Sequence, residues 1–140
     1  MIDNNCAYCV EGDLVAKFGI KICELETSKV YLFKEQSHPG RCIVAHKKHV
    51  GDMNELTAEE RAAYFEDVAR VARAIMKAFN PDKVNYGAYG DTGHHLHFHL
   101  CPKYKDEFEW GGVFLMNPDK KYLTDAEYAE MIEKIKEHLQ

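Results

Sequence analysis

The chain has 140 residues, of which 46% are hydrophobic and 29% charged, and its formal net charge is −5. This length fits a single globular domain over residues 1–140, which can bury a core without disulfides. The acidic balance argues against a nucleic-acid polymer as partner, although local donors could still hold a small phosphorylated ligand. Because no apolar stretch approaches 20 residues and no signal-peptide pattern is present, we expect a cytoplasmic protein without membrane contact.

Short apolar segments separated by turn residues fill the N-terminal part of the chain and are typical of β-strands. The composition changes at residues 36–40, where Gln, Ser, His, Pro and Gly follow one another and predict a loop. The strands that we expect on either side of this loop are residues 13–18, 20–25, 29–33 and 41–46.

Two capping boxes mark the starts of helices. Thr57, followed three residues later by Glu60, opens a long segment whose apolar residues recur every three or four positions. This helix should end at Asn80, directly before a proline. A second box, which begins at Thr124, predicts a C-terminal helix.

The region between these helices is predicted to form a hairpin. Residues 84–89 and 95–101 have strand character, and only residues 90–93 separate them, so we expect antiparallel pairing across a tight turn. Residues 103–122 are aromatic and charged and should pack over the sheet as an irregular segment. The whole order of elements predicts an α+β fold with an antiparallel sheet, one long central helix and a C-terminal helix.

Residues 95–100 read His-Leu-His-Phe-His-Leu and are the most informative part of the chain. Strict alternation indicates a half-buried strand, because successive side chains point to opposite faces of a sheet. The apolar residues should therefore pack on the core while His95, His97 and His99 share the other face. Pro102 is expected to end this strand, since it has no N–H to donate.

Three imidazoles on one face fit two kinds of chemistry. Histidines two residues apart could chelate a metal ion, or one neutral imidazole could act as a covalent nucleophile. A nucleophilic histidine needs an acceptor for its far nitrogen, which the backbone of an adjacent strand could supply. It also needs donors around a phosphate, which Thr92 and Gly93 could supply from the preceding turn. Surface histidines without a function are the third interpretation.

Residues 95–101 resemble the His-φ-His-φ-His-φ-φ motif of the histidine triad superfamily, in which φ is an apolar residue. The resemblance covers roughly residues 5–115. Besides the motif, it includes residues 39–44 (Pro-Gly-Arg-Cys-Ile-Val), residues 47–49 (Lys-Lys-His), the long helix, the strand at 85–90, and residues 102–104 (Pro-Lys-Tyr).

This resemblance implies a nucleotide hydrolase or nucleotidyltransferase that acts at the α-phosphate. Substrates in the family include adenosine phosphoramidates, aminoacyl adenylates and dinucleoside polyphosphates. By position, His97 would be the catalytic nucleophile that forms a nucleotidyl-imidazole, and His99 would contact the phosphate or the leaving group. Thr92 falls where the family commonly places a serine or threonine near the phosphate, and the family usually forms homodimers.

The sequence departs from the family pattern at two dipeptides. Gly40-Arg41 stands where many members have Gly-His, and Gly93-His94 stands where Gly-Gln is usual. Arg41 could offer its guanidinium to a phosphate instead. Gln36 and Asp91 are polar loop residues that could reach a ribose or phosphate, so they complete the predicted substrate-binding set.

A Cys-x-x-Cys motif lies near the N-terminus, at Cys6 and Cys9. Taken alone, it could be half of a zinc site, a redox pair or a coincidence, although no thioredoxin-like βαβ unit surrounds it. Many bacterial histidine triad proteins are similar in binding zinc through such a motif and two histidines. That resemblance implies one structural zinc ion on Cys6, Cys9, His49 and His95, with His46 as the substitute for His49.

Other functions stay open at the level of sequence. The altered Arg41 and His94 leave room for a non-catalytic nucleotide-binding protein, or for a zinc-stabilised interaction protein. A metallohydrolase with zinc on all three triad histidines is a further alternative. A turnover assay distinguishes a non-catalytic binding protein from an enzyme. Rapid loss of activity when a chelator is added would indicate the metallohydrolase.

Overall fold

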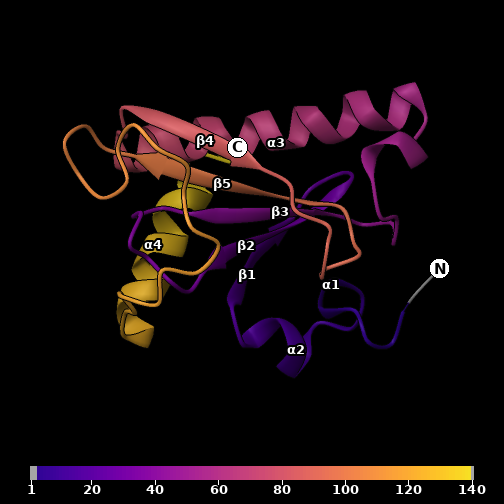
Figure 1. The fold of residues 1–140 in the computed structure, drawn as a ribbon, viewed down its shortest axis with the longest axis horizontal. Helices are drawn as coiled ribbons and strands as arrows, with labels where there is room; N and C mark the ends of the chain where they lie inside the picture. Colours follow the sequence, from indigo (N-terminus) through magenta and orange to yellow (C-terminus); the bar gives the residue numbers. More distant parts are fainter. Residues whose placement is uncertain (1–2, 140) are drawn as a thin grey trace.

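A five-stranded sheet organises the computed structural model, which describes residues 3–139 (Figure 1). The strands are β1 (Gly19–Glu24), β2 (Ser28–Phe33), β3 (Cys42–His46), β4 (Lys83–Gly87) and β5 (His97–Lys103). The helices are α1 (Ala7–Val10), α2 (Gly12–Ala16), the 3-10 helix η1 (Met53–Glu55), α3 (Ala58–Phe79) and α4 (Asp125–Glu137).

The sheet is antiparallel throughout, with the strand order β1-β2-β3-β5-β4. Helix α3 packs over β3 and β5, and α4 packs against α3 and β1, so both helices cover the same face (Figure 1). Between them and the sheet lies the main apolar core. The predicted α+β architecture is therefore confirmed.

Both long helices begin at the predicted capping boxes. The Thr57 hydroxyl accepts from the Glu60 N–H while the Glu60 carboxylate accepts from the Thr57 N–H, and the box at Thr124 does the same for α4. Helix α3 ends at Phe79 and is capped by Asn80, whose backbone is left-handed with φ 51°. Within residues 3–139, none of the helices has the length and apolar character needed to cross a bilayer.

The first predicted strand, residues 13–18, is wrong, because most of this segment forms the short helix α2. Its apolar run is only a few residues long, and so short a run does not distinguish a helical from a strand period. Positive φ angles at Glu11 and Gly12 turn the chain into this helix. Val15 is then buried beside Tyr8 in a second apolar cluster on the far face of the sheet from α3.

The predicted hairpin is confirmed as an antiparallel pair, but its connection is longer than a tight turn. Residues 88–96 join β4 to β5, so His95 lies just before the strand rather than within it. Pro102 does not end β5 and pairs with Val84. It is tolerated because the pairing of β5 with β3 stops at Leu100, which leaves β4 as the only neighbour there.

The alternation along β5 divides its side chains as predicted. Leu96 and Leu100 lie in the core under α3, and Phe98 packs against it. The three histidines are buried on the opposite face, where His97 is paired with Ala45 and His99 with Ile43. The segment containing α1 and α2 covers this histidine face (Figure 1).

Candidate active site

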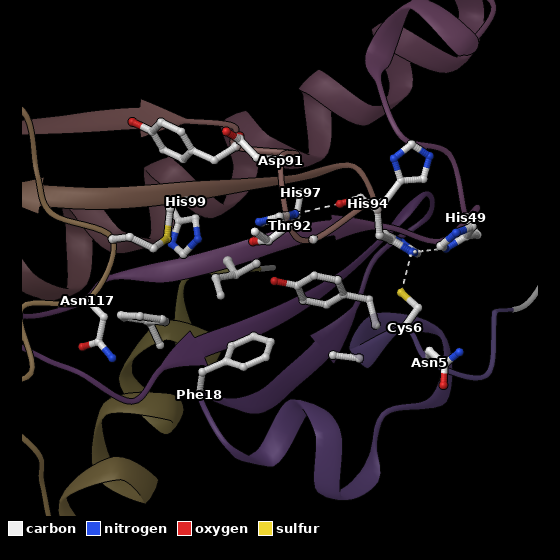
Figure 2. Close-up of a pocket in the computed structure, with 18 of the residues that line it drawn as sticks. Asn5, Cys6, Phe18, His49, Asp91, Thr92, His94, His97, His99 and Asn117 are labelled. Atoms are coloured by element: carbon white, nitrogen blue, oxygen red, sulfur yellow. Dashed lines mark hydrogen bonds between the residues drawn. The ribbon is translucent and has the colours of Figure 1, made fainter.

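A cavity of about 1000 Å³ opens in front of the triad histidines (Figure 2). One wall comes from α1, one from the loop of residues 88–96, and one from the irregular segment of residues 104–122, here called the strap. Asp91 and Thr92 line the cavity as exposed loop residues. Their predicted contact with substrate stays a prediction, but both side chains are placed where such contact is possible.

His97 is held in one tautomer by its own strand. Its Nδ1–H donates to the main-chain carbonyl of His95 at 2.7 Å, so Nε2 keeps its lone pair. We expected this acceptor from an adjacent strand, and it comes instead from two residues earlier in the chain. Burial lowers the pKa of His97, which keeps the imidazole neutral. A neutral imidazole with a free nitrogen at a cavity wall is a competent nucleophile.

His99 has the opposite hydrogen-bonding pattern. Its Nδ1 lies 3.1 Å from a guanidinium nitrogen of Arg41, which can only donate, so the remaining proton of a neutral ring is on Nε2. Burial, and then the positive charge of Arg41, lowers the pKa of His99 to about 3. His99 can therefore offer an N–H donor to a ligand, whereas His97 offers a lone pair.

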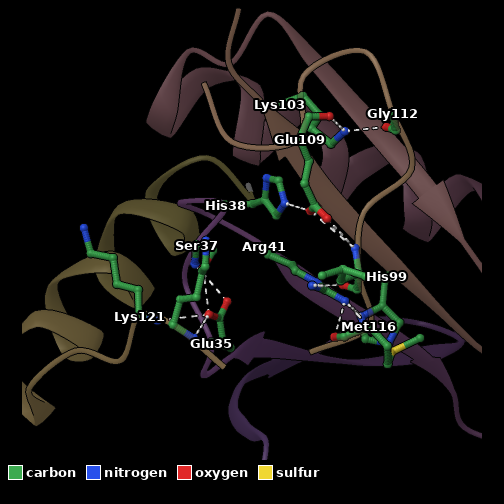
Figure 3. A network of polar contacts seen from close by, with 12 residues as sticks. Glu35, Ser37, His38, Arg41, His99, Lys103, Glu109, Gly112, Met116 and Lys121 are labelled. Atoms are coloured by element: carbon green, nitrogen blue, oxygen red, sulfur yellow. Dashed lines mark hydrogen bonds and ion pairs between the residues drawn. The ribbon is translucent and has the colours of Figure 1, made fainter. Parts of the chain in front are cut away.

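Arg41 and Gln36 lie behind the cavity rather than among the residues that line it. Arg41 is completely buried, and its guanidinium donates to the carbonyls of Leu115 and Met116 at 3.0 Å each (Figure 3). The Gln36 amide is used locally, because its oxygen accepts from the Gly40 N–H at 2.8 Å. Direct contact of either residue with a substrate stays a prediction.

Four further side chains converge at the end of the cavity nearest the N-terminus. The potential ligand atoms of Cys6, Cys9, His49 and His95 all lie within 4.8 Å of one another. Cys6 Sγ is 3.3 Å and Cys9 Sγ is 3.6 Å from His95 Nδ1. His49 Nδ1 is 3.3 Å from Cys9 Sγ and 3.1 Å from His95 Nδ1. Ligand atoms around a tetrahedral zinc ion lie about 3.3–3.8 Å apart, for bonds of about 2.0–2.3 Å.

The tautomer of His95 also fits a metal ligand. Its Nε2 donates to the carbonyl of His46 at 2.6 Å, which leaves the Nδ1 lone pair directed at the two thiols. His46 itself lies outside the cluster, where its Nδ1 accepts from the Lys48 N–H. This Cys2His2 cluster could bind zinc, and His49 rather than His46 completes it.

Several aromatic walls of the cavity were not predicted. The Tyr8 ring packs against two triad histidines, with its centroid 5.4 Å from that of His95 and 5.0 Å from that of His97. Its position between the two cysteines is the one sequence signal that could have indicated this role. Phe18, Phe33 and Phe114 also line the cavity, and nothing in their spacing pointed there.

Comparison with known proteins identifies the family. The sequence profile of the HIT domain, the histidine triad domain, matches residues 19–106. The chain belongs to the HIT domain family. "Protein hit" of Bacillus subtilis is 30% identical over 122 residues, which are 82% of each protein.

Two further relatives of this HIT domain protein have named activities. Adenosine 5'-monophosphoramidase hnt1 of Schizosaccharomyces pombe is 28% identical over 76% of this chain and 80% of the relative. Bis(5'-adenosyl)-triphosphatase of Dictyostelium discoideum is 28% identical over 66% of this chain and 65% of the relative. The coarse function that accompanies the family is therefore nucleotide hydrolysis.

Crystal structures of histidine triad proteins share the fold. One from Sinorhizobium meliloti superposes with a TM-score of 0.83, at 22% identity, over 91% of this chain and 94% of that chain. A zinc-bound histidine triad family protein from Mycobacterium smegmatis gives a TM-score of 0.68, also at 22% identity, over 96% and 92% of the two chains. At these identities the likeness establishes the fold alone.

Proposed function

We propose that this HIT domain protein cleaves adenosine phosphoramidates or dinucleoside polyphosphates at the α-phosphate through a covalent nucleotidyl-His97 intermediate. The observation that carries the proposal is the tautomer of His97. Its Nδ1–H is bound to the His95 carbonyl at 2.7 Å, so the Nε2 lone pair is left for attack from the wall of a cavity of about 1000 Å³.

The reaction has two displacements at phosphorus. His97 Nε2 forms a bond to the α-phosphorus while the bond from phosphorus to the leaving amine or phosphate breaks, and the leaving amine takes up a proton. Water then attacks the same phosphorus, the bond to Nε2 breaks, the water releases a proton, and the nucleoside monophosphate leaves. Another acceptor in place of water would give transfer instead of hydrolysis.

Donors for the phosphate oxygens come from two sides of the cavity in this proposal. His99 has its proton on Nε2, because Nδ1 faces the Arg41 guanidinium at 3.1 Å. Thr92 offers a hydroxyl from the exposed loop before β5. Such donors stabilise the charge that develops on phosphate in the transition state.

The choice of adenosine-containing substrates rests on relatives. One relative is named for adenosine 5'-monophosphoramidase activity and another for hydrolysis of a dinucleoside triphosphate. The phosphoramidate is favoured, because the relative named for it is matched over more of both chains.

The Cys6, Cys9, His49 and His95 cluster is assigned in this proposal to one structural zinc ion. When bound, zinc would cross-link the N-terminal segment to the start of β5, and no reaction step passes through it. Only one triad histidine belongs to the cluster found among residues 3–139. His97 and His99 are instead engaged by the His95 carbonyl and by Arg41, which disfavours a metallohydrolase built on all three imidazoles.

A homodimer is proposed as the assembly. Strand β4 lies at one end of the sheet order, so one of its edges has no neighbouring strand within the described chain. Tyr86 on this strand is 52% exposed. An edge strand with an exposed aromatic residue can pair with a second copy. Light scattering coupled to size exclusion would give twice the chain mass, whereas a single chain mass would contradict the proposal.

The test of function is release of nucleotide by the purified chain and by two variants. Adenosine 5'-phosphoramidate, a lysyl-adenylate mimic and diadenosine tetraphosphate are the substrates. We expect AMP or ATP release by the parent and by His138→Ala, an exposed control at the end of α4, and none by His97→Ala. Acid-quenched mass spectrometry should detect a nucleotidyl adduct on His97. A folded parent that binds AMP and releases nothing would be a binding protein.

A further inference from the structure

Arg41 is a completely buried cation without a carboxylate partner. None of the ion pairs found between residues 3 and 139 includes it. Its guanidinium lies against the rings of Phe33 and Phe114, 4.2 and 4.8 Å from their centroids, and its Nε has no hydrogen-bond partner. Burying an unpaired charge costs free energy, so this placement calls for a reason beyond packing.

The contacts of Arg41 divide between the strap and the triad. Two strap carbonyls, those of Leu115 and Met116, each accept a guanidinium proton at 3.0 Å. The third polar contact is His99 Nδ1 at 3.1 Å, on the side of the imidazole away from Nε2 (Figure 3). One planar guanidinium therefore holds both the strap and the third histidine of the triad.

The contact with His99 allows one chemical assignment only. A guanidinium has no acceptor atom and stays charged in proteins, so His99 Nδ1 must present its lone pair to Arg41. The single proton of the neutral ring is then on Nε2. His97 has the opposite assignment, because its Nδ1–H donates to the His95 carbonyl. The two imidazoles, whose centroids are 5.4 Å apart, therefore differ at Nε2. His97 presents a lone pair there, and His99 presents an N–H donor.

We propose that Arg41 is a positioning residue that fixes His99 as an Nε2–H donor to the substrate phosphate and places a positive charge without an ion-pair partner behind that donor. This inference rests on the proposed function for its phosphate ligand. In this inference, Arg41 does not touch the substrate and affects it only by orienting His99. The carboxylates of Glu35 and Glu109 act on Arg41 only from beyond ion-pair distance. The bound phosphate adds negative charge on the cavity side of His99.

Lys103 provides a matched control. It is also a buried cation, 2% exposed, and its Nζ donates to the strap carbonyls of Glu109 and Gly112 at 2.7 Å each. Among its hydrogen bonds within residues 3–139, none involves a triad histidine. Lys103→Met therefore removes a buried charge and two strap contacts but leaves His99 bound to Arg41.

The first readout is the tautomer of His99, measured without substrate by long-range proton–nitrogen correlation on protein labelled at its histidines with ¹⁵N. His99→Asn identifies the signals. We expect Nδ1 unprotonated and Nε2 protonated in the parent and in Lys103→Met, and a mixture of tautomers in Arg41→Met. Protonated Nδ1 in the parent, or an unchanged tautomer in Arg41→Met, would overturn the inference.

The second readout is turnover of adenosine 5'-phosphoramidate. Arg41→Met should lower kcat at least about tenfold, as expected when a transition-state donor is misdirected, whereas Lys103→Met should lower it much less. Equal losses in both variants would overturn the inference, since they would indicate a general role in holding the strap. If the parent has the expected tautomer but no turnover, the proposed function fails while the assignment of His99 stands.

Arg41→Lys is a second variant for the case in which Arg41→Met does not fold. The lysine ammonium group keeps the positive charge. Because it is a single nitrogen, it cannot contact His99 and both strap carbonyls as the planar guanidinium does. We expect a mixed His99 tautomer and a reduced kcat in this variant. A parent-like tautomer together with a parent-like kcat would contradict the role given to the guanidinium.

Discussion

The main-chain carbonyl of His95 accepts the Nδ1–H of His97 at 2.7 Å, while the side chain of the same His95 belongs to the Cys2His2 cluster. The residue that helps to form the metal cluster therefore also sets the tautomer of the proposed nucleophile. Because His95 Nε2 is bound to the His46 carbonyl, the ring is fixed from β3 as well.

The first prediction concerns loss of the metal. Cys9→Ser should lower the zinc content from one ion per chain and reduce the free energy of unfolding by about 2–5 kcal/mol, because a cross-link between the N-terminal segment and β5 is lost. Elemental analysis and urea unfolding measure the two effects. Cys23→Ser, a half-buried cysteine outside the cluster, is the control and should keep its zinc. Full zinc content in Cys9→Ser would contradict the ligand set.

Turnover after metal removal separates a structural from a catalytic ion. Because the proposed reaction has no step at the cluster, the chelated protein should melt at a lower temperature but retain most of its activity while it is folded. Rapid and reversible loss of activity on addition of a chelator, at a temperature where the fold persists, would instead indicate a metallohydrolase.

The second prediction concerns Tyr8, whose buried ring packs against His95 and His97. Tyr8→Ala removes this wall and should cost about 3–5 kcal/mol of the free energy of unfolding, together with a fall in kcat/KM. Tyr8→Phe keeps the ring and should behave like the parent in both measurements. If the phenylalanine variant lost as much kcat/KM as the alanine variant, the hydroxyl rather than the ring would be the important group.

Much of this architecture could be predicted because local chemistry determined it. The capping boxes at Thr57 and Thr124 satisfy helix N–H groups within one turn, so they mark helix starts without reference to the rest of the fold. The alternation in residues 95–100 likewise reports which side chains face the core. The joint position of Cys6, Cys9, His49 and His95 came from family resemblance, and no spacing rule would have joined residues so far apart.

What the sequence did not predict depends on tertiary contacts. Residues 13–16 are helical, and Val15 is buried there in the apolar cluster that includes Tyr8, a partner that the local pattern does not contain. The contacts of Arg41 with the strap could not be predicted, because the carbonyls that bind it come from more than 70 residues later. The position of a loop that folds over a site cannot be predicted from hydrophobic periodicity, because an irregular segment has no repeating pattern.

The third prediction concerns Gly40, which precedes Arg41 and has φ +95°. An added Cβ would lie 2.6 Å from Cδ2 of Phe79, so Gly40→Ala suffers both backbone strain and a clash. We expect a loss of about 2–5 kcal/mol in the free energy of unfolding. Gly111 has a similar φ of +90° with open space around it, so Gly111→Ala should lose only about 1–2 kcal/mol. Equal losses in urea unfolding would contradict the clash.

The fourth prediction concerns acid stability through His99. Burial and the Arg41 charge lower its pKa from the ordinary 6.5 to about 3 in the folded chain. Between these values the unfolded chain binds more protons than the folded one, so stability rises with pH there. The contribution of neutral His99 to the free energy of unfolding is fully present above about pH 6.5 and declines as the pH falls toward about 3.

His99→Asn tests this assignment, because the amide oxygen can still accept from Arg41 while the side chain no longer titrates. The free energy of unfolding, measured in urea from pH 7 to pH 4, should fall less steeply in this variant than in the parent. The exposed His138 provides the comparison, and His138→Asn should keep the parent slope. An identical slope in His99→Asn and the parent would mean that His99 does not stay neutral in the folded chain. The guanidinium contact would then not determine its protonation.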